Sequence, residues 1–184
     1  IKSFVPSIEF YNNELNNTIT IKDMLAHRTG VTRHDLIWYK SDYTRAELFG
    51  KLKYLEPAQP LRQGFLYNNL MYAASGQIIY LIEGKTWEEY LQEKILNPLQ
   101  MKHTVFSIDA MQKHTDYFVG YNEKRDTNIL LEAEYMNETD GLGPAGSIVS
   151  NISDLSHWLS ALMNKGMYEG KQVIPEATIN ATLA

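Results

Sequence analysis

Residues 66–84 read LYNNLMYAASGQIIYLIEG, and this stretch decides the fold that we expect. Apolar side chains occupy almost every side of the helical repeat from Asn69 to Ile82, which predicts a helix that is buried on most sides. Gly84 then provides a natural helix end, because glycine adopts the left-handed conformation without strain. The apolar residues of this helix are Leu70, Met71, Ala73, Ala74, Ile78, Ile79, Leu81 and Ile82.

Around this helix, three segments begin with a threonine that is followed three residues later by an acid. This spacing is typical of a capping box, in which the two side chains satisfy free amides at a helix start. We therefore expect helices in residues 19–30, 44–55 and 86–96. Another helix is expected after Asn151 or Ser153, and a last one at Pro175. The three pairs are Thr20 with Asp23, Thr44 with Glu47, and Thr86 with Glu89.

Little of the remaining sequence favours strands. Short strands are expected at residues 118–121 and 129–131, and a β-like run at 147–150. The fold class that we predict is therefore mainly α with minor β. Residues 122–140 contain six acids and two basic residues, and we interpret them as a solvated surface excursion.

Composition excludes several classes of function. The chain has 184 residues, 44% of them apolar and 21% charged, as in an ordinary globular domain. Its net charge of −5 argues against a nucleic-acid partner. No cysteine is present and the five histidines form no HxH or HExxH pair, so we expect neither a metal nor a cofactor. The longest apolar run, residues 71–82, is too short to span a bilayer.

The sequence starts and ends abruptly, without polar terminal segments. The sequence opens with IKSFVPSIEF and closes with PEATINATLA, which resembles a helix that has just started. Natural domains usually end in polar segments. We therefore expect residues 1–184 to be a single partial domain from inside a longer protein.

Chemistry is indicated most clearly at the start of the apolar helix. Tyr67 would be fixed there by the helix while its hydroxyl reaches a cleft, and Asn69 could offer an amide beside it. A base next to a substrate-orienting group suits proton transfer. The competing interpretation is a helix cap with a packed aromatic ring. His27 is expected to have a structural role, such as hydrogen bonding to a loop, and Arg28 and Tyr39 are further candidates for lining the pocket.

Three ordered blocks of sequence carry a resemblance to a known family. They are ITIKDMLAHRTGV (19–31), LYNNLMYAASGQIIYLIEGKTWEEYLQEKILNPLQMKHT (66–104) and GPAGSIVSNISDLSHWLSALMNKG (143–166). Together they resemble the serine β-lactamase-like and penicillin-binding protein superfamily, which includes class C β-lactamases, D-Ala-D-Ala peptidases and esterases. The chain departs from the family pattern at Gln100 and Ser147, where glycine is common.

The resemblance implies the helical subdomain of the β-lactamase/transpeptidase-like α/β fold, without the flanking segments that supply the sheet. In that family, the tyrosine and asparagine of a Y-x-N motif serve a serine nucleophile from an S-x-x-K motif, and they match Tyr67 and Asn69. No other catalytic motif matches, because no lysine follows a serine by three residues and neither K-T-G nor H-x-G occurs. We therefore expect the isolated piece to be inactive.

Three functions follow as hypotheses. The first is part of a serine acyl-hydrolase or transferase that acts on a β-lactam, a D-Ala peptide or an ester through a covalent acyl-serine. The second is a catalytically dead family member that binds a peptide or a partner. The third is a free-standing helical interaction domain. Family analogy also implies a periplasmic or extracellular location, and an uncovered apolar face predicts self-association of the piece.

Overall fold

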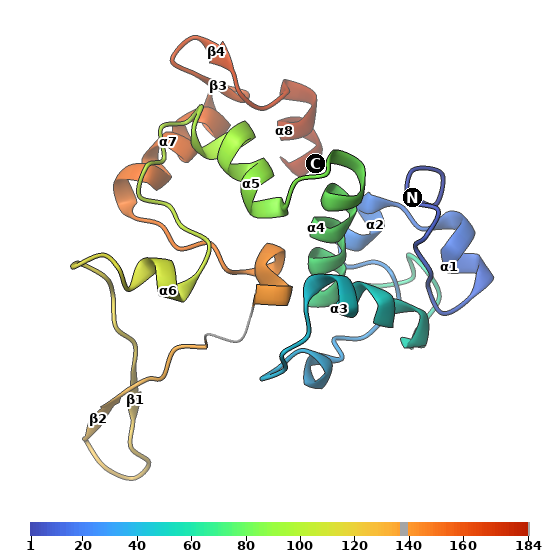
Figure 1. The fold of residues 1–184 in the computed structure, drawn as a ribbon, viewed down its shortest axis with the longest axis horizontal. Coiled ribbons are helices and arrows are strands. Elements are labelled where there is room, and N and C mark those ends of the chain that lie inside the picture. Colours follow the sequence, from blue (N-terminus) through green and yellow to red (C-terminus); the bar gives the residue numbers. More distant parts are fainter. Residues whose placement is uncertain (137–139, 184) are drawn as a thin grey trace.

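The computed structural model describes residues 1–136 and 140–183, and it is mainly helical, as expected (Figure 1). The α-helices are α1 (Asn13–Thr18), α2 (Ile21–Leu25), α3 (Arg45–Lys51), α4 (Asn69–Glu83), α5 (Trp87–Leu91), α6 (Ile108–Met111), α7 (Ile152–Met163) and α8 (Glu176–Leu183). Shorter helical turns are η1 (Asp35–Ile37), η2 (Leu52–Tyr54), the π-helical η3 (Gln92–Leu96) and η4 (Asp140–Ala145). The strands are β1 (Tyr121–Glu123), β2 (Leu130–Glu132), β3 (Met167–Tyr168) and β4 (Lys171–Gln172).

The apolar helix forms as predicted and lies in the middle of the molecule, where α2, α3, α5 and η4 pack against it (Figure 1). Its start is capped by the Asn68 side chain, and Gly84 ends it in the left-handed conformation with φ of 68°. The first half of the helix is buried, as predicted. The prediction of burial on most sides is wrong for the last turn. There Tyr80, Leu81 and Ile82 are about half exposed.

The three predicted capping boxes are confirmed, each with both of its hydrogen bonds. Side chains from residues 1–78 and Leu142 build the larger core around α4. A smaller core joins η3 to α7 through Leu96, Leu99, Met101 and Ala161. The helix expected after Asn151 or Ser153 begins directly after Asn151, whose side chain accepts a hydrogen bond from the Asp154 amide.

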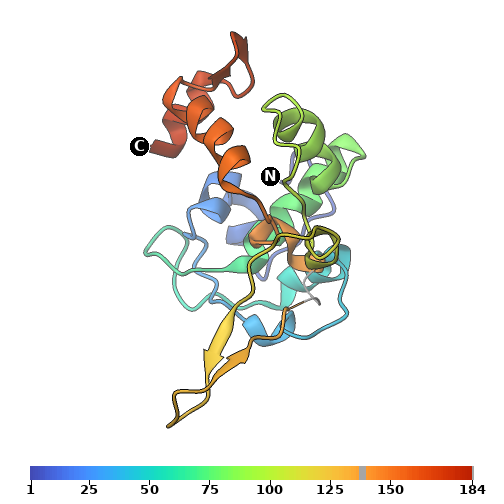
Figure 2. The ribbon, with the colours of Figure 1, turned by 90° about the vertical axis from the view of Figure 1, so that its left-hand side faces the viewer.

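A two-stranded antiparallel hairpin, β1 with β2, extends away from the helical body in both views (Figures 1 and 2). The strands lie slightly later in the chain than expected, and every residue in them is exposed. The acids Glu123, Asp126, Glu132 and Glu134 are also exposed, which confirms the surface excursion for this part. Glu138 and the Asp140 side chain lie outside the described residues.

Several small elements were not expected from the sequence. These are α1, α6 and the β3–β4 hairpin. In contrast, the expected β-like run at 147–150 is reduced to a single bridge between Val105 and Val149. Within the described residues, no helix combines the length and the apolar character needed to cross a membrane.

Candidate functional site

The turn that carries Tyr67 is fixed by the buried side chain of the next residue. Asn68 is inaccessible to solvent, and its Oδ1 accepts a hydrogen bond from the Met71 amide at the start of α4 (3.2 Å). Its Nδ2 donates to the carbonyl oxygens of Thr32 (2.6 Å) and Val31 (3.3 Å). Asn68 therefore ties the helix start to the loop at residues 31–32, while Asn69 is the first residue of the helix.

His27 also holds this turn. Its Nδ1 accepts a hydrogen bond from the Asn68 amide (3.1 Å), and its carbonyl oxygen accepts one from the Leu66 amide (2.8 Å). The imidazole ring also lies against the Tyr67 ring, with 4.6 Å between the two centroids. These contacts confirm the expected structural role of His27, and they bracket Tyr67 between two backbone anchors.

Tyr67 and Asn69 line one cavity of about 330 Å³. Tyr67 is 42% exposed, so its ring is open to this cavity and not sealed within the core. The other walls come from η1 and from the segments on both sides of the hairpin. They are Trp38, Phe106, Ser107, Ile108, Met136, Leu142, Ala145, Gly146, Ser147 and Val149.

Two expected lining residues are absent from this wall. Trp38 takes the place that we expected for its neighbour Tyr39, which is nearly half exposed elsewhere. Arg28 turns away and donates a hydrogen bond to the carbonyl oxygen of Arg62. Both expectations failed because sequence proximity does not determine the direction of a side chain in a loop.

A positively charged side chain that was not expected from the sequence lies against the Tyr67 ring. The Arg33 guanidinium lies 5.1 Å from the centroid of the Tyr67 ring, and it also pairs with Asp35 at 2.6 Å. A guanidinium this close to an aromatic face is attracted to the ring and places positive charge beside it.

Ser147, which stands where the family pattern has glycine, also lines the cavity. Its Oγ is buried and has no hydrogen-bond partner among the described residues. Unpaired buried hydroxyls are rare, which makes Ser147 an unusual feature of this wall.

Burial shifts the pKa of two residues near Tyr67. It lowers the pKa of His27, which favours the neutral imidazole. It raises the pKa of Tyr72, whose hydroxyl donates to the Leu25 carbonyl oxygen (2.8 Å). Tyr72 also places its ring 5.1 Å from that of His27, so His27 lies in a largely aromatic surrounding.

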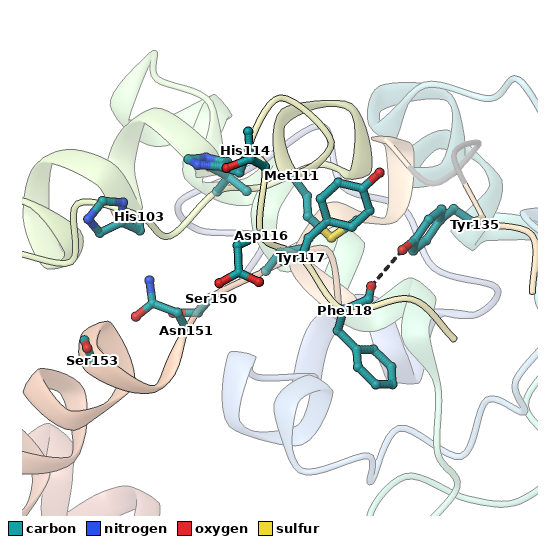
Figure 3. A pocket seen from close by; sticks show the side chains of 13 residues that line it. His103, Met111, His114, Asp116, Tyr117, Phe118, Tyr135, Ser150, Asn151 and Ser153 are labelled. Carbon is teal, nitrogen blue, oxygen red and sulfur yellow. Dashed lines mark hydrogen bonds between the residues drawn. The ribbon is translucent and has the colours of Figure 1, made fainter. Parts of the chain in front are cut away.

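A larger hollow of about 800 Å³ lies between α6, the base of the hairpin and the start of α7 (Figure 3). It contains neither Tyr67 nor Asn69, although it shares Val149 with their cavity. The rings of His103 and His114 lie 6.4 Å apart on its wall, and the described residues hold no group of histidines and acids suited to a metal ion. We therefore place the candidate site at the smaller cavity, where the groups suited to proton transfer meet.

Comparison with known proteins gives a consistent result. The sequence profile of the family described as Beta-lactamase matches residues 2–183. The chain is 31% identical to "Unguisins hydrolase ungD" of Aspergillus violaceofuscus over 152 residues, which are 79% of this chain and 27% of that protein. It is 30% identical to "Protein flp" of Staphylococcus aureus over 172 residues, which are 89% of this chain and 33% of that protein. The chain thus spans about a third or less of the length of these curated relatives.

Solved structures with low sequence identity share the fold. An octameric penicillin-binding protein homologue from Pyrococcus abyssi matches with a TM-score of 0.77 at 21% identity, over 97% of this chain and 41% of that one. A D-stereospecific amidohydrolase from Streptomyces sp. matches with a TM-score of 0.75 at 18% identity, over 97% of this chain and 55% of that one. Both neighbours support the helical subdomain that the sequence predicted.

Proposed function

The chain belongs to the beta-lactamase family, and we propose that the whole protein is a serine acyl-hydrolase or transferase that forms a covalent acyl-serine. The observation that carries this proposal is the meeting of Tyr67 and Asn69 in one open cavity. The three sequence blocks and the family match support the same proposal.

Tyr67 is the proposed proton carrier. The serine oxygen would bond to the substrate carbonyl carbon while its proton passes to the Tyr67 oxygen. That proton would then go to the leaving nitrogen or oxygen as the carbonyl carbon–nitrogen or carbon–oxygen bond breaks. Water or an amine would release the acyl group by the reverse proton path. For this step Tyr67 must react as the phenolate, and the lysines of the family's S-x-x-K and K-T-G motifs, which residues 1–184 lack, would be the nearby cations that favour this form.

Asn69 is the proposed orienting group. Its amide lies at the first position of α4, a rigid element, and would hydrogen-bond the amide of the substrate or the family's catalytic lysine. We propose a β-lactam, a D-Ala peptide or a small ester as the substrate, and a periplasmic or extracellular location by family analogy.

The nucleophile would come from an S-x-x-K motif of the whole protein, because residues 1–184 contain none. We therefore expect residues 1–184 alone to have no acyl-transfer activity. Turnover of a chromogenic β-lactam or a p-nitrophenyl ester by this piece would contradict the assignment of Tyr67 as a partner of that missing motif.

The test uses the whole protein and the variant Tyr67→Phe. Loss of a general base usually lowers turnover about 10²- to 10⁴-fold, and we expect a decrease in this range for a chromogenic β-lactam, a D-Ala amide or a p-nitrophenyl ester. Tyr80→Phe is the matched control, because Tyr80 lies near the far end of α4, the helix that Tyr67 precedes, and is exposed there. Equal activity of Tyr67→Phe and wild type would overturn the proposed role.

Mass spectrometry separates the enzyme from the catalytically dead alternative. A slow β-lactam should leave a covalent adduct on a serine of the whole protein. If no adduct forms and no substrate turns over, while a peptide still binds, the binding-protein alternative is favoured.

A further inference from the structure

We infer that His27 is a positioning residue for Tyr67 and that it works only as the neutral imidazole with an unprotonated Nδ1. This inference rests on the proposed function, in which Tyr67 carries a proton and must therefore keep a fixed position. His27 does not line the Tyr67 cavity, so it would act through the turn that carries Tyr67.

The backbone conformation of His27 indicates that neighbouring contacts fix this residue. Its φ is 55°, in the left-handed region that residues with a side chain adopt at a cost. Such a conformation persists where neighbouring contacts fix it. Here those contacts are the hydrogen bonds from the amides of Leu66 and Asn68, one on each side of Tyr67.

The hydrogen bond to Asn68 determines the tautomer of the ring. A backbone amide only donates, so Nδ1 of His27 must accept and carries no proton. A neutral ring then has its proton on Nε2. Protonation of Nδ1 would break this bond and leave the buried Asn68 amide facing a second donor, which is unfavourable in a site closed to water.

The groups around the ring favour the neutral form. Tyr67 and Tyr72 face it with their rings from the turn and from α4, and Phe65 lies edge-on at 5.3 Å. Among the described residues no carboxylate forms an ion pair with it, and the nearby cation, Arg33, lies over the Tyr67 ring. The neighbouring Arg28 points to the Arg62 carbonyl oxygen. Burial therefore acts on His27 without an acid to oppose it, and lowers its pKa.

A consequence for catalysis follows from this geometry. At neutral pH the ring anchors the turn, and Tyr67 keeps its place in the cavity. When acid protonates His27, the anchor at Asn68 is lost and Tyr67 moves relative to the expected nucleophile. Because a small misplacement of a catalytic group slows chemistry more than it weakens binding, kcat should fall more than KM rises.

Two substitutions in the whole protein test this role. His27→Asn places an amide oxygen close to the position of Nδ1, tolerates the left-handed backbone and cannot be protonated near neutral pH. We expect it to retain most of the wild-type kcat at pH 7.5 and to lose the acidic limb of the kcat profile that belongs to His27. His27→Phe keeps a ring without an acceptor, and we expect its kcat to fall by about 10-fold or more at every pH, with KM changed much less.

His34→Asn is the matched control. His34 is also left-handed, with φ of 48°, but its Nε2 contacts the Thr32 hydroxyl and it does not line the Tyr67 cavity. We expect this variant to keep both the kcat and the acidic limb of the wild type. A purely structural role of His27 would lower thermal stability and activity together and leave the acidic limb in place in His27→Asn.

Nuclear magnetic resonance provides a readout that does not depend on turnover. In the whole protein labelled with ¹⁵N-asparagine, the Asn68 amide signal should shift with pH in step with the His27 ring. In His27→Asn it should stay constant over the same range, while in His34→Asn it should behave as in wild type. An Asn68 signal that ignores pH in the wild type would overturn the inference.

Failure of this inference and failure of the proposed function are distinguishable. If Tyr67→Phe abolishes turnover while His27→Phe keeps the wild-type kcat, only the role of His27 is wrong. If Tyr67→Phe remains fully active, the proposed function is wrong, and the Asn68 signal still decides whether neutral His27 holds the turn.

Discussion

At the scale of single residues, two adjacent asparagines lie in opposite surroundings. Asn68 is sealed in the structure, where it caps α4 and binds the loop at residues 31–32. Asn69 faces the cavity with Tyr67. The sequence motif identified Asn69 as the candidate, but it could not show that Asn68 fixes the turn. A capping asparagine and a substrate-binding asparagine have the same chemistry, and only burial separates them.

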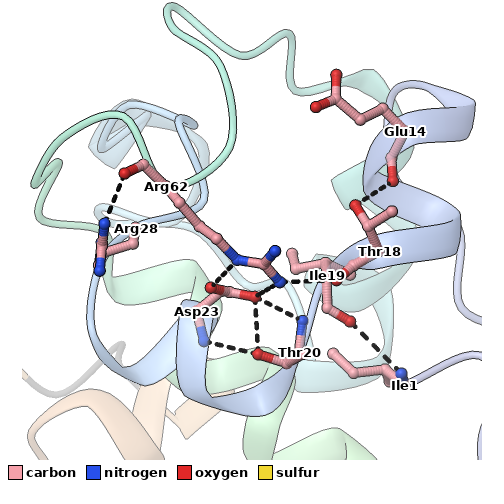
Figure 4. A network of polar contacts seen from close by, with 8 residues as sticks. All are labelled: Ile1, Glu14, Thr18, Ile19, Thr20, Asp23, Arg28 and Arg62. Carbon is pink, nitrogen blue, oxygen red and sulfur yellow. Dashed lines mark hydrogen bonds and ion pairs between the residues drawn. The ribbon is translucent and has the colours of Figure 1, made fainter.

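Asp23 shows how a single buried carboxylate stabilises this region. Its two oxygens accept hydrogen bonds from Arg62 Nε and Nη2, both at 2.8 Å, and the Thr20 amide donates to Oδ2 at 2.9 Å (Figure 4). The hydrogen bonds from Arg62 lower the pKa of Asp23 from 3.8 to about 2. Because α2 leads directly to His27, this network also supports the turn at Tyr67.

We predict a stability change with pH from this carboxylate. Since its pKa is lower in the folded chain, its contribution is complete above pH 4–5 and is lost as the pH falls from about 4 towards 2. Arg62 is about half exposed, so solvent screening limits the contribution to roughly 1–2 kcal/mol. Chemical denaturation at several pH values should show that Asp23→Asn lowers the free energy of unfolding at pH 7 and flattens its decline in acid.

The control for this prediction is the exposed pair of Glu9 with Lys53, at 3.3 Å. Exposed ion pairs contribute little to stability, so Glu9→Gln should leave the free energy of unfolding nearly unchanged. If the free energy of unfolding of Asp23→Asn declines in acid as steeply as that of the wild type, Asp23 is not the source of the pH dependence.

At the scale of elements, helix starts were predictable and marginal elements were not. The three capping boxes were identified because a capping box is local in sequence, and each one forms. Helices α1 and α6 have six and four residues, too few to display a helical period. The hairpin was misplaced by a few residues because both of its faces are exposed, and no alternation of apolar and polar side chains marks its register.

The packing of α4 against η4 depends on a glycine that sequence reasoning had not singled out. A Cβ atom on Gly76 would lie 2.3 Å from Cγ of Pro144, closer than van der Waals contact permits. Helix propensity alone favours alanine over glycine by about 1 kcal/mol. Steric exclusion therefore opposes propensity at this position, and we expect it to prevail because a proline ring is rigid.

We predict that Gly76→Ala destabilises the chain by about 1–3 kcal/mol, the usual cost of overpacking. It should also disturb the Tyr67 cavity, because Leu142 and Ala145 of η4 and the following Gly146 line that cavity. Thermal denaturation measures the first effect. Gly50→Ala is the control, because Gly50 lies inside α3 with nothing within 4 Å of its Cβ position, and this variant should be slightly more stable than wild type. If Gly76→Ala is as stable as Gly50→Ala, η4 can move away from the added methyl group without a loss of stability.

At the scale of the whole molecule, the structure has a well-packed centre and an incompletely covered outside. Sequence patterns predicted the centre, because burial of α4 imposes a strong apolar pattern. They did not predict which ends of the apolar helices remain uncovered. Besides the last turn of α4, α7 exposes one apolar face along its whole length, formed by Ile152, Leu155, Leu159 and Met163. These residues follow each other at intervals of three and four, so they lie on one side of the helix.

Such a face predicts the behaviour of residues 1–184 in solution. Contiguous exposed apolar surface binds other apolar surface, so we expect this chain to self-associate and to bind a dye that fluoresces on apolar surfaces. Leu159→Lys places a charge in the middle of the α7 face and should reduce both effects. Leu36→Lys should not, because Leu36 is 92% exposed on the separate turn η1 and lies outside that face. Sedimentation velocity and dye titration of the two variants side by side test this prediction. A monomeric wild type that binds no dye would show that the α7 face does not drive association.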